Sequence, residues 1–335
     1  MIRDSVRKLV EGKDLSKDEA FEAMSDIMSG NVSEPLIASF LTALRMKGET
    51  VAEIAGCARA MREKAIKIET KRSDVIDTCG TGGDSLGTFN ISTTAAIVSS
   101  GAGAIVAKHG NRAISSRCGS ADVLKALGVN IETPKEKVEQ CLDEVGIAFL
   151  FAPMMHGAMK YAAPVRRELG IRTVFNILGP LTNPAGARRQ LIGVFDARLT
   201  EPLANVLLEL GSERAMVVHG EGGLDEISTL GKTTISELKN GAVSTYEFDH
   251  LSVGVPATSI REIAGGDAEF NAQIVREIIS GKKSPQRDIT VLNAGAALYV
   301  AGMASTLKEG IGLANESIDS GNSQKKLDAL IAVTQ

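Results

Sequence analysis

The chain has 335 residues, of which 44% are hydrophobic and 23% charged, a composition typical of globular proteins that bury a core without disulfide or metal support. Trp is absent and only 4% of residues are aromatic, so the core must be mostly aliphatic, which suits helices packed on a parallel sheet. The net charge of −4, without a long block of one sign, argues against general binding of nucleic acid, which needs a basic surface. A small polyanionic substrate stays compatible with this charge, because a few local cations and a metal can bind one.

Residues 1–71 predict helices and no strand. The segments 16–19 and 50–53 each carry a hydroxyl residue followed three positions later by Glu, which is the pattern of a capping box. Ser33 can cap a third helix, because apolar residues recur at helical spacing after it. The first ten residues are charged and contain no apolar core, so we expect no signal peptide. The segment is predicted to form a small helical lobe.

From residue 72 onward, strand-like and helix-like segments alternate. Five short apolar runs predict strands: residues 75–79, 104–108, 147–151, 191–196 and 215–219. Helical stretches lie between them, one of which is capped by Thr133 with Pro134 at its first position. This alternation is typical of an α/β domain with a mostly parallel central sheet flanked by helices, which we assign to residues 72–161 and 189–335. The most apolar run, 95–107, is too short to span a membrane.

The stretch 162–188 departs from this alternation. It combines Arg166, Arg167 and Glu168 with a later run of turn-forming residues. We expect it to join the helical lobe, which would make that lobe discontinuous. At the end of the chain, residues 293–333 predict two Ala-rich amphipathic helices.

The run GTGGD, residues 80–84, directly follows the first predicted strand. Successive glycines allow backbone N–H groups to surround an anion, because no Cβ blocks its approach. A tight turn is the plain alternative. Ser85 stands where a dinucleotide fingerprint needs its third glycine, and Glu226 stands where a P-loop ending at Lys232 and Thr233 needs its first. Neither NAD nor ATP is therefore indicated.

Residues 88–94, with the sequence TFNISTT, place several hydroxyl and amide side chains just before an apolar helix. A helix N-terminus favours anions through its free N–H groups and its dipole. Ordinary N-capping would explain one such hydroxyl, but not several within one turn. We therefore expect this helix to begin beside the glycine loop and to bind an anion together with it.

Residues 108–120 follow the second predicted strand and concentrate three cations, one His and many hydrogen-bond donors. Ligands of α/β folds bind at the carboxyl ends of parallel strands. A solvated basic loop is the alternative for this segment taken alone. Together with the glycine loop, the segment predicts an anion site.

Three of these segments resemble the signature of the anthranilate phosphoribosyltransferases: GTGGD at 80–84, NIST at 90–93 and KHGNR at 108–112. Further blocks similar to that family are FNILGPLTNP at 175–184, GLDE at 223–226 and the helix with NAG at 293–295. The resemblance covers nearly the whole chain, with the blocks in the family's order. It implies the fold of nucleoside-phosphorylase-like phosphoribosyltransferases. It also implies transfer of the phosphoribosyl group of 5-phosphoribosyl-1-diphosphate (PRPP) to anthranilate, in tryptophan biosynthesis.

The resemblance implies that the sugar diphosphate lies against the glycine loop and the two segments after it. Carried over to this sequence, its binding residues are Gly80, Gly83, Asp84, Thr88, Asn90, Ile91, Ser92, Thr93, Lys108, His109, Gly110, Asn111, Arg112, Ala113, Ile114, Ser115, Ser116 and Ser120. These are the segments in which the residues themselves already indicated an anion site.

The resemblance also implies Mg²⁺, as two ions, held by Ser92, Asp225 and Glu226. A diphosphate leaving group needs its charge neutralised, and hard oxygen ligands suit this ion. Taken alone, the two adjacent carboxylates would be an ordinary solvated pair. The strand and the glycine-rich loop before them place them at the same edge of the sheet.

Anthranilate is expected at Gly80, Asn111 and Arg166, again by resemblance. Its carboxylate suits the directed hydrogen bonds of a guanidinium, although Arg166 taken alone would be an ordinary surface cation. His109, His156 and Gly179 are weaker candidates for the lining of this pocket, and His156 could equally be a packed core histidine. We assign no general base, because an aromatic amine is already unprotonated at neutral pH.

Two other functions stay open. A pyrimidine nucleoside phosphorylase would resemble this fold, but the KHGN sequence at 108–111 fits the transferase better than the Lys-x-Ser pattern expected of the phosphorylase. A nucleic-acid-binding relative without transferase activity would need a basic surface. The net charge of −4 and the intact pair of Asp225 and Glu226 speak against it.

The four cysteines, Cys57, Cys79, Cys118 and Cys141, show no CxxC spacing. A chain of this size does not need disulfides, so free thiols in a reducing cytoplasm are the better interpretation. We expect neither nucleic acid nor a membrane as a partner. From the resemblance alone, we expect a homodimer that associates through the helical lobe.

Overall fold

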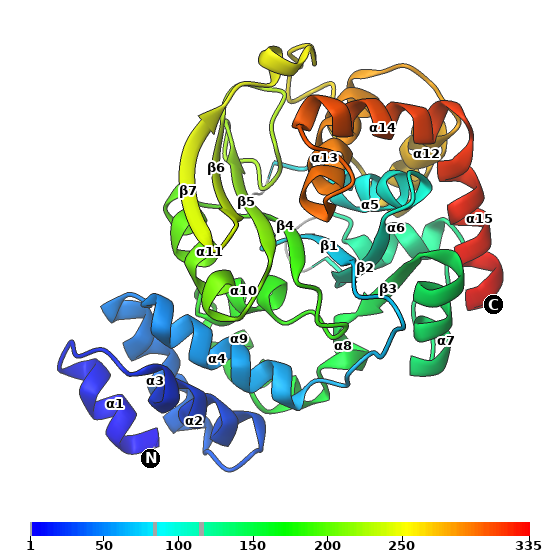
Figure 1. Cartoon of the computed structure of the whole chain (residues 1–335). Coiled ribbons are helices and arrows are strands. Elements are labelled where there is room, and N and C mark those ends of the chain that lie inside the picture. The colour runs from blue at the N-terminus through cyan, green and yellow to red at the C-terminus, as the bar shows by residue number, and fades with distance from the viewer. Residues whose placement is uncertain (1, 83–85, 114–116) are drawn as a thin grey trace.

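The computed structural model describes residues 2–82, 86–113 and 117–335. In these ranges, seven strands form one sheet in the order β3-β2-β1-β4-β5-β6-β7 (Figure 1). Their bounds are β1 Val75–Gly80, β2 Ile105–Gly110, β3 Ile147–Phe151, β4 Arg189–Gly193, β5 Arg214–Gly220, β6 Thr233–Lys239 and β7 Ala242–Phe248. The strands β1 to β5 pair in parallel, which confirms the predicted mostly parallel sheet.

Strands β6 and β7 form an antiparallel hairpin that the sequence analysis did not predict. Most of β7 is exposed, so its residues do not form an apolar run. The turn between the two strands is Asn240-Gly241, with φ angles of 54° and 75°. This dipeptide favours two-residue hairpin turns, because both positions need positive φ. The dipeptide is therefore the signal for this hairpin in the sequence, and a search for apolar runs does not detect it.

Helices cover both faces of the sheet (Figure 1). In the α/β part they are α5 Ile91–Gly101, α6 Ser120–Ala126, α7 Lys135–Gln140, α11 Thr200–Glu209, α12 Ala268–Ile279, α13 Pro285–Ala301, α14 Leu307–Asp319 and α15 Asn322–Thr334. α5 and α13 pack on one face at β1, and α11 packs on the other at β5 and β6. Side chains of β5 alternate accordingly: Met216 and Val218 belong to the core under α13, whereas Ala215 and Val217 belong to the core under α11. In the described ranges, no helix is long and apolar enough to cross a membrane.

Three boundaries differ from the expected ones. The apolar run 191–196 continues past β4, which ends at Gly193. α7 is preceded by Pro134 as its N-cap, and the Thr133 hydroxyl donates to the carbonyl of Asn130 at 2.5 Å instead of capping the helix. Residues 293–333, predicted as two helices, contain the end of α13, the whole of α14 and most of α15.

The N-terminal part is helical, as expected: α1 Ile2–Val10, α2 Lys17–Met28, α3 Glu34–Lys47 and α4 Val51–Lys64. Both predicted capping boxes form. The side chains of Ser16 and Thr50 accept from the backbone N–H groups of Glu19 and Glu53, whose carboxylates accept from the cap residues in return. Ser33 is the N-cap of α3, but its side chain makes no capping bond.

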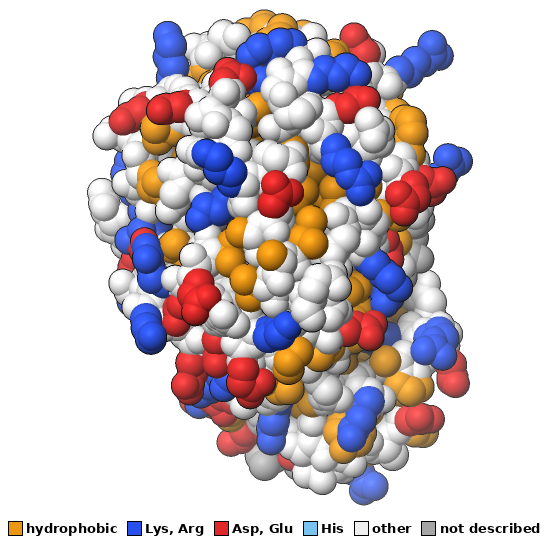
Figure 2. Space-filling view, turned by 90° about the vertical axis from the view of Figure 1, so that its right-hand side faces the viewer, with side chains coloured by type: hydrophobic (Ala, Val, Ile, Leu, Met, Phe, Trp, Pro, Cys, Tyr) orange, Lys and Arg blue, Asp and Glu red, His pale blue; other side chains and the backbone are white. Residues whose placement is uncertain are grey.

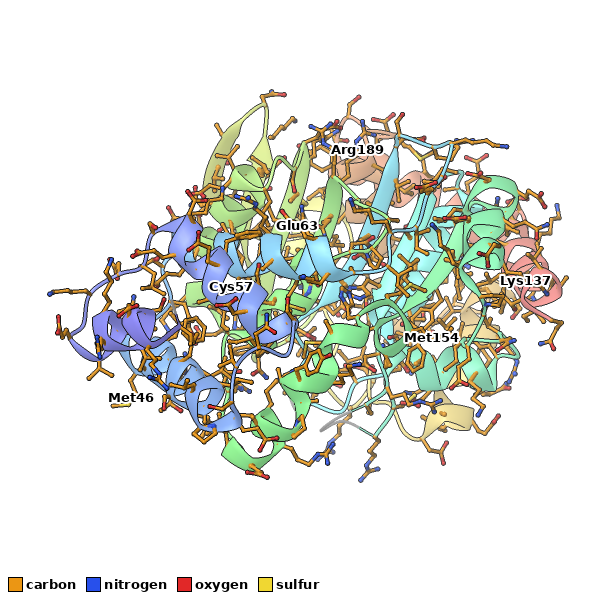
Figure 3. The ribbon with its side chains drawn as sticks, turned by 90° about the horizontal axis from the view of Figure 1, so that it is seen from below. Met46, Cys57, Glu63, Lys137, Met154 and Arg189 are labelled. Atoms are coloured by element: carbon orange, nitrogen blue, oxygen red, sulfur yellow. The ribbon has the colours of Figure 1, made fainter. Side chains whose placement is uncertain are left out.

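A later part of the chain packs against this helical lobe. It contains α9 Ala163–Leu169 and α10 Phe175–Leu178, and the short helix α8 Ala152–Met155 precedes it directly after β3. α9 contacts α3, and α10 contacts α4. Figure 3 shows Met46 at the outer end of the lobe and Lys137 at the opposite end of the molecule. Single turns of other helix types lie at Cys141–Val145, Gly157–Tyr161, Gly179–Leu181, Ala197–Leu199 and His250–Val253.

The strand order reverses between β1 and β4, because the chain adds β2 and β3 on one side and β5 on the other. Such a switch point leaves a crevice at the carboxyl ends of the strands, where ligands of α/β folds bind. Gly80 of β1 and Gly193 of β4 face each other at this edge. A Cβ on Gly193 would lie 1.5 Å from the backbone oxygen of Asp225, and one on Gly80 would lie 2.7 Å from its Oδ2. Glycine at both positions therefore allows the segment around Asp225 to lie on the edge of the sheet.

We predict opposite effects of two Gly→Ala substitutions in helices. A Cβ on Gly56 of α4 would lie 2.2 Å from the carbonyl oxygen of Lys17 in α2, so Gly56→Ala must force the helices apart and should lower the free energy of unfolding by about 1–3 kcal/mol. Gly312 of α14 has open space around it, and Gly312→Ala should raise that free energy by about 0.5–1 kcal/mol through helix propensity. Urea unfolding measures both. An equal effect of the two substitutions would contradict the close packing of α2 on α4.

Candidate active site

Two cavities adjoin at the carboxyl edge of the sheet. The more polar one has a volume of about 550 Å³ and is called the polar cavity. The other has a volume of about 510 Å³, is lined mostly by apolar groups and is called the apolar cavity. Residues 79–81 and 109–111 and Asn176 line both of them. A reactant bound in one cavity can therefore meet a reactant bound in the other.

The polar cavity brings together the residues expected at the sugar diphosphate, as far as the structure describes them. Those that line it are Gly80, Thr88, Asn90, Ile91, Ser92, Thr93, Lys108, His109, Gly110, Asn111, Arg112, Ala113 and Ser120. Asp225 and Glu226, expected at the metal, also line it. The expected residues Gly83, Asp84, Ile114, Ser115 and Ser116 lie outside the described residues.

The N-terminus of α5 opens into the polar cavity. Asn90 is the N-cap of the helix, and Ile91 is its first residue. The amide of Asn90 is fixed in direction, because its Nδ2 donates to the carbonyl of Cys118 at 3.2 Å and its Oδ1 accepts from Nδ2 of Asn271 at 2.9 Å. The helix thus presents its positive end to the cavity, where it favours an anion.

Lys108, at the end of β2, is a buried cation beside this helix terminus. Its side chain is 3% exposed, and its Nζ donates to the carbonyl of Thr78 and, at 3.3 Å, to Oγ of Ser92. Burial lowers the pKa of Lys108, whereas the nearby carboxylates, with Asp77 first, oppose that shift. A phosphate group in the cavity would favour the charged ammonium.

Asp225 and Glu226 reach the same place from the loop that follows β5. Asp225 Oδ2 accepts from the backbone N–H of Gly82 at 3.0 Å, and Glu226 Oε1 accepts from that of Ser92 at 3.0 Å. The two carboxylates thereby connect the glycine loop with the start of α5. Burial, and then the charge of Asp225, raise the pKa of Glu226 to about 8.

The hydroxyl of Ser92 and these two carboxylates fit a hard divalent cation. All three groups supply oxygen donors to the polar cavity, and such donors suit Mg²⁺. In the described ranges, no three His, Cys, Asp or Glu residues cluster as a metal site. Mg²⁺ at phosphate sites commonly completes its coordination with oxygens of the substrate and of water. The raised pKa of Glu226 is the response expected of a buried carboxylate beside a second one without a bound cation.

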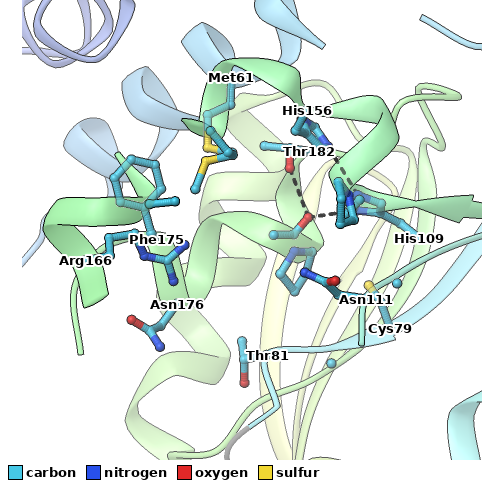
Figure 4. Close-up of a pocket in the computed structure, with 18 of the residues that line it drawn as sticks. Met61, Cys79, Thr81, His109, Asn111, His156, Arg166, Phe175, Asn176 and Thr182 are labelled. Atoms are coloured by element: carbon cyan, nitrogen blue, oxygen red, sulfur yellow. Dashed lines mark hydrogen bonds between the residues drawn. The ribbon is translucent and has the colours of Figure 1, made fainter. Parts of the chain in front are cut away.

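Arg166 of α9 lies in the wall of the apolar cavity, whereas Ser92, Asp225 and Glu226 line the polar one. Its guanidinium carbon lies 5.1 Å from the centre of the Phe175 ring, and burial lowers its pKa. Figure 4 shows Arg166, Phe175 and Asn176 on one side of the cavity and Asn111 on the other. A guanidinium among apolar groups can recognise the carboxylate of a flat aromatic ligand.

His109 and His156 form a chain of hydrogen bonds in another wall of this cavity (Figure 4). His109 Nδ1 lies 3.1 Å from the carbonyl oxygen of Gly179, which can only accept, so Nδ1 carries the proton. His109 Nε2 lies 3.2 Å from Nε2 of His156. Burial lowers the pKa of His109 to about 3 and that of His156 to about 4. Both rings are neutral at pH 7, and each nitrogen of His109 lies within hydrogen-bond distance of a polar neighbour.

Several lining residues were not found from the sequence. Arg172 lies over the ring of Phe195 at 3.9 Å, and the backbone N–H of Phe195 donates to the hydroxyl of Thr81 at 3.2 Å. All three residues line the polar cavity. Thr81 could have been found as a member of the glycine loop, but nothing local distinguishes one exposed arginine or one phenylalanine after a strand.

Comparison with known proteins gives a consistent result over the whole chain. Residues 72–324 match the model of the glycosyl transferase family, a/b domain, and residues 3–65 match that of the glycosyl transferase family, helical bundle domain. The chain is 55% identical to anthranilate phosphoribosyltransferase from Acetivibrio thermocellus, with 100% of this chain and 97% of that protein covered. It is 56% identical to the enzyme of that name from Moorella thermoacetica, with 99% and 98% covered.

Solved structures of the same name match closely. Anthranilate phosphoribosyltransferase from Thermus thermophilus has a TM-score of 0.94 at 45% identity, with 99% of both chains covered. The enzyme from Saccharomyces cerevisiae in complex with PRPP and Mg has a TM-score of 0.91 at 30% identity, with 99% of this chain and 97% of that chain covered. A further yeast structure contains 4-fluoroanthranilate.

We predict that the neutral His109 makes stability depend on pH. Its pKa of about 3 in the folded protein lies below the value of about 6.5 expected when unfolded. The stabilisation is therefore complete above pH 6.5 and is lost as the pH falls toward 3. Urea unfolding at a series of pH values should show that the wild type loses roughly 2–3 kcal/mol more than His109→Asn between pH 7 and pH 4. Parallel pH profiles of the two proteins would contradict the neutral state assigned to His109.

Proposed function

The chain belongs to the anthranilate phosphoribosyltransferase family, and we propose on this basis which of its residues bind each substrate. The enzyme transfers the phosphoribosyl group of PRPP to the amine of anthranilate and so acts in tryptophan biosynthesis. The products are N-(5-phosphoribosyl)anthranilate and diphosphate. One observation carries the assignment of the sites: a cavity rich in anion-binding groups adjoins an apolar cavity with an arginine, and Gly80 and Asn111 line both.

PRPP binds in the polar cavity under this proposal. Its diphosphate lies near Lys108 and the N-terminus of α5, because a buried ammonium and free helix N–H groups both favour a dense negative charge. The remaining residues of the expected set, from Gly80 to Ser120, surround the sugar and its phosphates. The complex of the yeast enzyme with PRPP and Mg supports this choice of ligand.

The enzyme uses Mg²⁺, and we propose two ions at Ser92, Asp225 and Glu226. Their oxygen donors and their place at the polar cavity support this assignment. Bound Mg²⁺ neutralises charge on the diphosphate as it leaves. The protein's own part is to hold the two carboxylates in place through the N–H groups of Gly82 and Ser92.

Anthranilate binds in the apolar cavity, with its carboxylate toward Arg166 and its ring among apolar side chains. Gly80 and Asn111 lie where this cavity meets the polar one, so they can contact the amine end of the substrate. The yeast complex with 4-fluoroanthranilate shows that a close analogue binds to a related enzyme.

In the reaction, the bond from C1 of the ribose to the diphosphate oxygen breaks, and its electron pair leaves with the diphosphate. The anthranilate nitrogen forms the new bond to C1 and then releases a proton. Lys108 and the donors at the start of α5 stabilise the leaving group. We assign no general base, and the engaged nitrogens of His109 support this. Most of the acceleration then comes from holding the two reactants in line.

The domain boundaries and the homodimer are also proposals. The contacts of α9 with α3 and of α10 with α4 support a discontinuous helical lobe formed by residues 1–71 and 162–188. Val10 at the end of α1 and Met46 in α3 are 73% and 83% exposed, which supports association through this lobe. The molecular mass in solution tests the dimer.

A cytoplasmic location is proposed on the basis of the four cysteines, which are all buried and free. The face shown in Figure 2 carries Lys and Arg side chains interspersed with Asp and Glu. This face therefore offers no continuous basic surface of the kind that a nucleic-acid-binding relative would need.

The proposed activity predicts loss of anthranilate fluorescence when the protein is mixed with anthranilate, PRPP and Mg²⁺. Chelation of the metal should stop the loss, and added Mg²⁺ should restore it, because the diphosphate leaves poorly without charge neutralisation. Thymidine with phosphate should release no thymine, which separates the transferase from a nucleoside phosphorylase. An enzyme that consumes no anthranilate under any metal condition would overturn the function.

We predict that Arg166→Ala raises the KM for anthranilate roughly 10- to 100-fold, the range expected for loss of hydrogen bonds to a charged group. The KM for PRPP should change much less, because Arg166 does not line the polar cavity. Arg167→Ala is the matched control, since Arg167 lies on the exposed side of the same helix. Steady-state kinetics with each substrate varied in turn measures both effects. Equal loss for both substrates would remove Arg166 from its assigned role.

A further inference from the structure

Asn293 is a polar residue in the middle of the apolar helix α13. It is fully buried, and so are Leu292 and Ala294 beside it. An amide in such surroundings is unfavourable unless its donors and acceptor are all paired. The contacts of Asn293 therefore show what its polar group does in the folded protein.

The side chain of Asn293 makes two hydrogen bonds to the backbone of Ile227. Its Oδ1 accepts from the N–H of Ile227 at 2.9 Å, and its Nδ2 donates to the carbonyl of Ile227 at 2.9 Å. The second N–H of Nδ2 donates to the carbonyl of Ile289 in the same helix, also at 2.9 Å. Only this orientation of the amide pairs all three groups, because a flipped amide would place its oxygen against two carbonyls. The amide of Asn293 thus pairs with both the N–H and the carbonyl of Ile227, as a backbone residue of a neighbouring strand would do.

Ile227 directly follows Asp225 and Glu226, the proposed metal-binding carboxylates. The side chains of Leu224 and Ile227 on either side of this pair are both fully buried. The backbone of Asp225 lies against Gly193, which leaves no room for movement toward the sheet. Asn293 of α13 holds the same segment at Ile227. The acidic pair is thus fixed between the edge of the sheet and a helix that does not itself line either cavity.

We propose that Asn293 is a positioning residue for the metal site. It sets the place of the Asp225 and Glu226 carboxylates through the backbone of Ile227, and it touches no substrate. A leucine of the same shape would fill the core equally well but could make none of the three hydrogen bonds. The inference rests on the proposed metal ligands and adds a residue that determines how well they bind.

The test is binding of Mn²⁺, as a probe for Mg²⁺, in the presence of excess PRPP and without anthranilate, so that no turnover occurs. Water proton relaxation reports the ion when it tumbles with the protein. Asn293→Leu should weaken Mn²⁺ binding roughly 10- to 100-fold, the effect typical of residues that orient metal ligands. It should raise the Mg²⁺ concentration for half-maximal activity by a similar factor, and leave the KM for anthranilate within about twofold at saturating Mg²⁺.

The matched control is Asn315→Leu. Asn315 lies on the neighbouring helix α14, and its amide bonds Arg287 and the carbonyl of Ile311, so its loss disturbs the same helical layer without reaching the metal segment. Asn293→Ser replaces Asn293→Leu if the leucine variant does not fold, because a shorter side chain leaves room for water at the freed backbone groups. If the Asn293 variants bind Mn²⁺ as tightly as the wild-type protein, the role of Asn293 is overturned but the proposed metal ligands are not. Absence of Mn²⁺ binding by the wild-type protein with PRPP would overturn the metal assignment, and the inference with it.

Discussion

The close approach of two backbone segments at the carboxyl edge of the sheet determines the rest of the site. The carbonyl of Asp225 occupies the space that a side chain on Gly193 would need, and the Asp225 carboxylate lies against Gly80. Because β1 and β4 end in glycine, a loop from beyond β5 can lie across the switch point of the sheet. That approach puts the carboxylates of Asp225 and Glu226 beside the start of α5. The free N–H groups at the start of this helix favour a bound anion at the same place.

The same approach brings charges of opposite sign into a largely buried place. Burial lowers the pKa of Lys108 and raises that of Glu226, so each group is shifted toward its neutral form. A phosphate beside Lys108 and a cation at the carboxylates would each favour the charged form again. A magnesium diphosphate supplies both charges at once, which connects the electrostatics of the free protein with the ligand of its family.

The α/β part and the part of the chain beside the helical lobe meet in the wall of the apolar cavity. Gly179 belongs to the part of the chain that packs near the helical lobe, whereas His109 lies in β2 of the sheet. The hydrogen bond between them lies in the wall of the apolar cavity and joins these two parts. Arg166 comes from α9, which contacts α3 of the lobe, while the polar cavity is formed mostly by the α/β part. Under the proposed assignment, the acceptor and the donor of the phosphoribosyl group are therefore bound by different parts of the fold.

The sequence by itself determined the alternation of helix and strand and the capping boxes at Ser16 and Thr50, and it predicted an anion site from the segments at 80–84, 90–93 and 108–112. These features depend on neighbours in the chain, so local pattern and chemistry are enough to find them. Only the tertiary structure decided that Arg172 stacks on Phe195, that His109 is held as one neutral tautomer, and that Asn293 holds the backbone of Ile227. Each of these depends on residues far apart in the chain, whose distance is set by packing of whole elements and leaves no periodic or local signal.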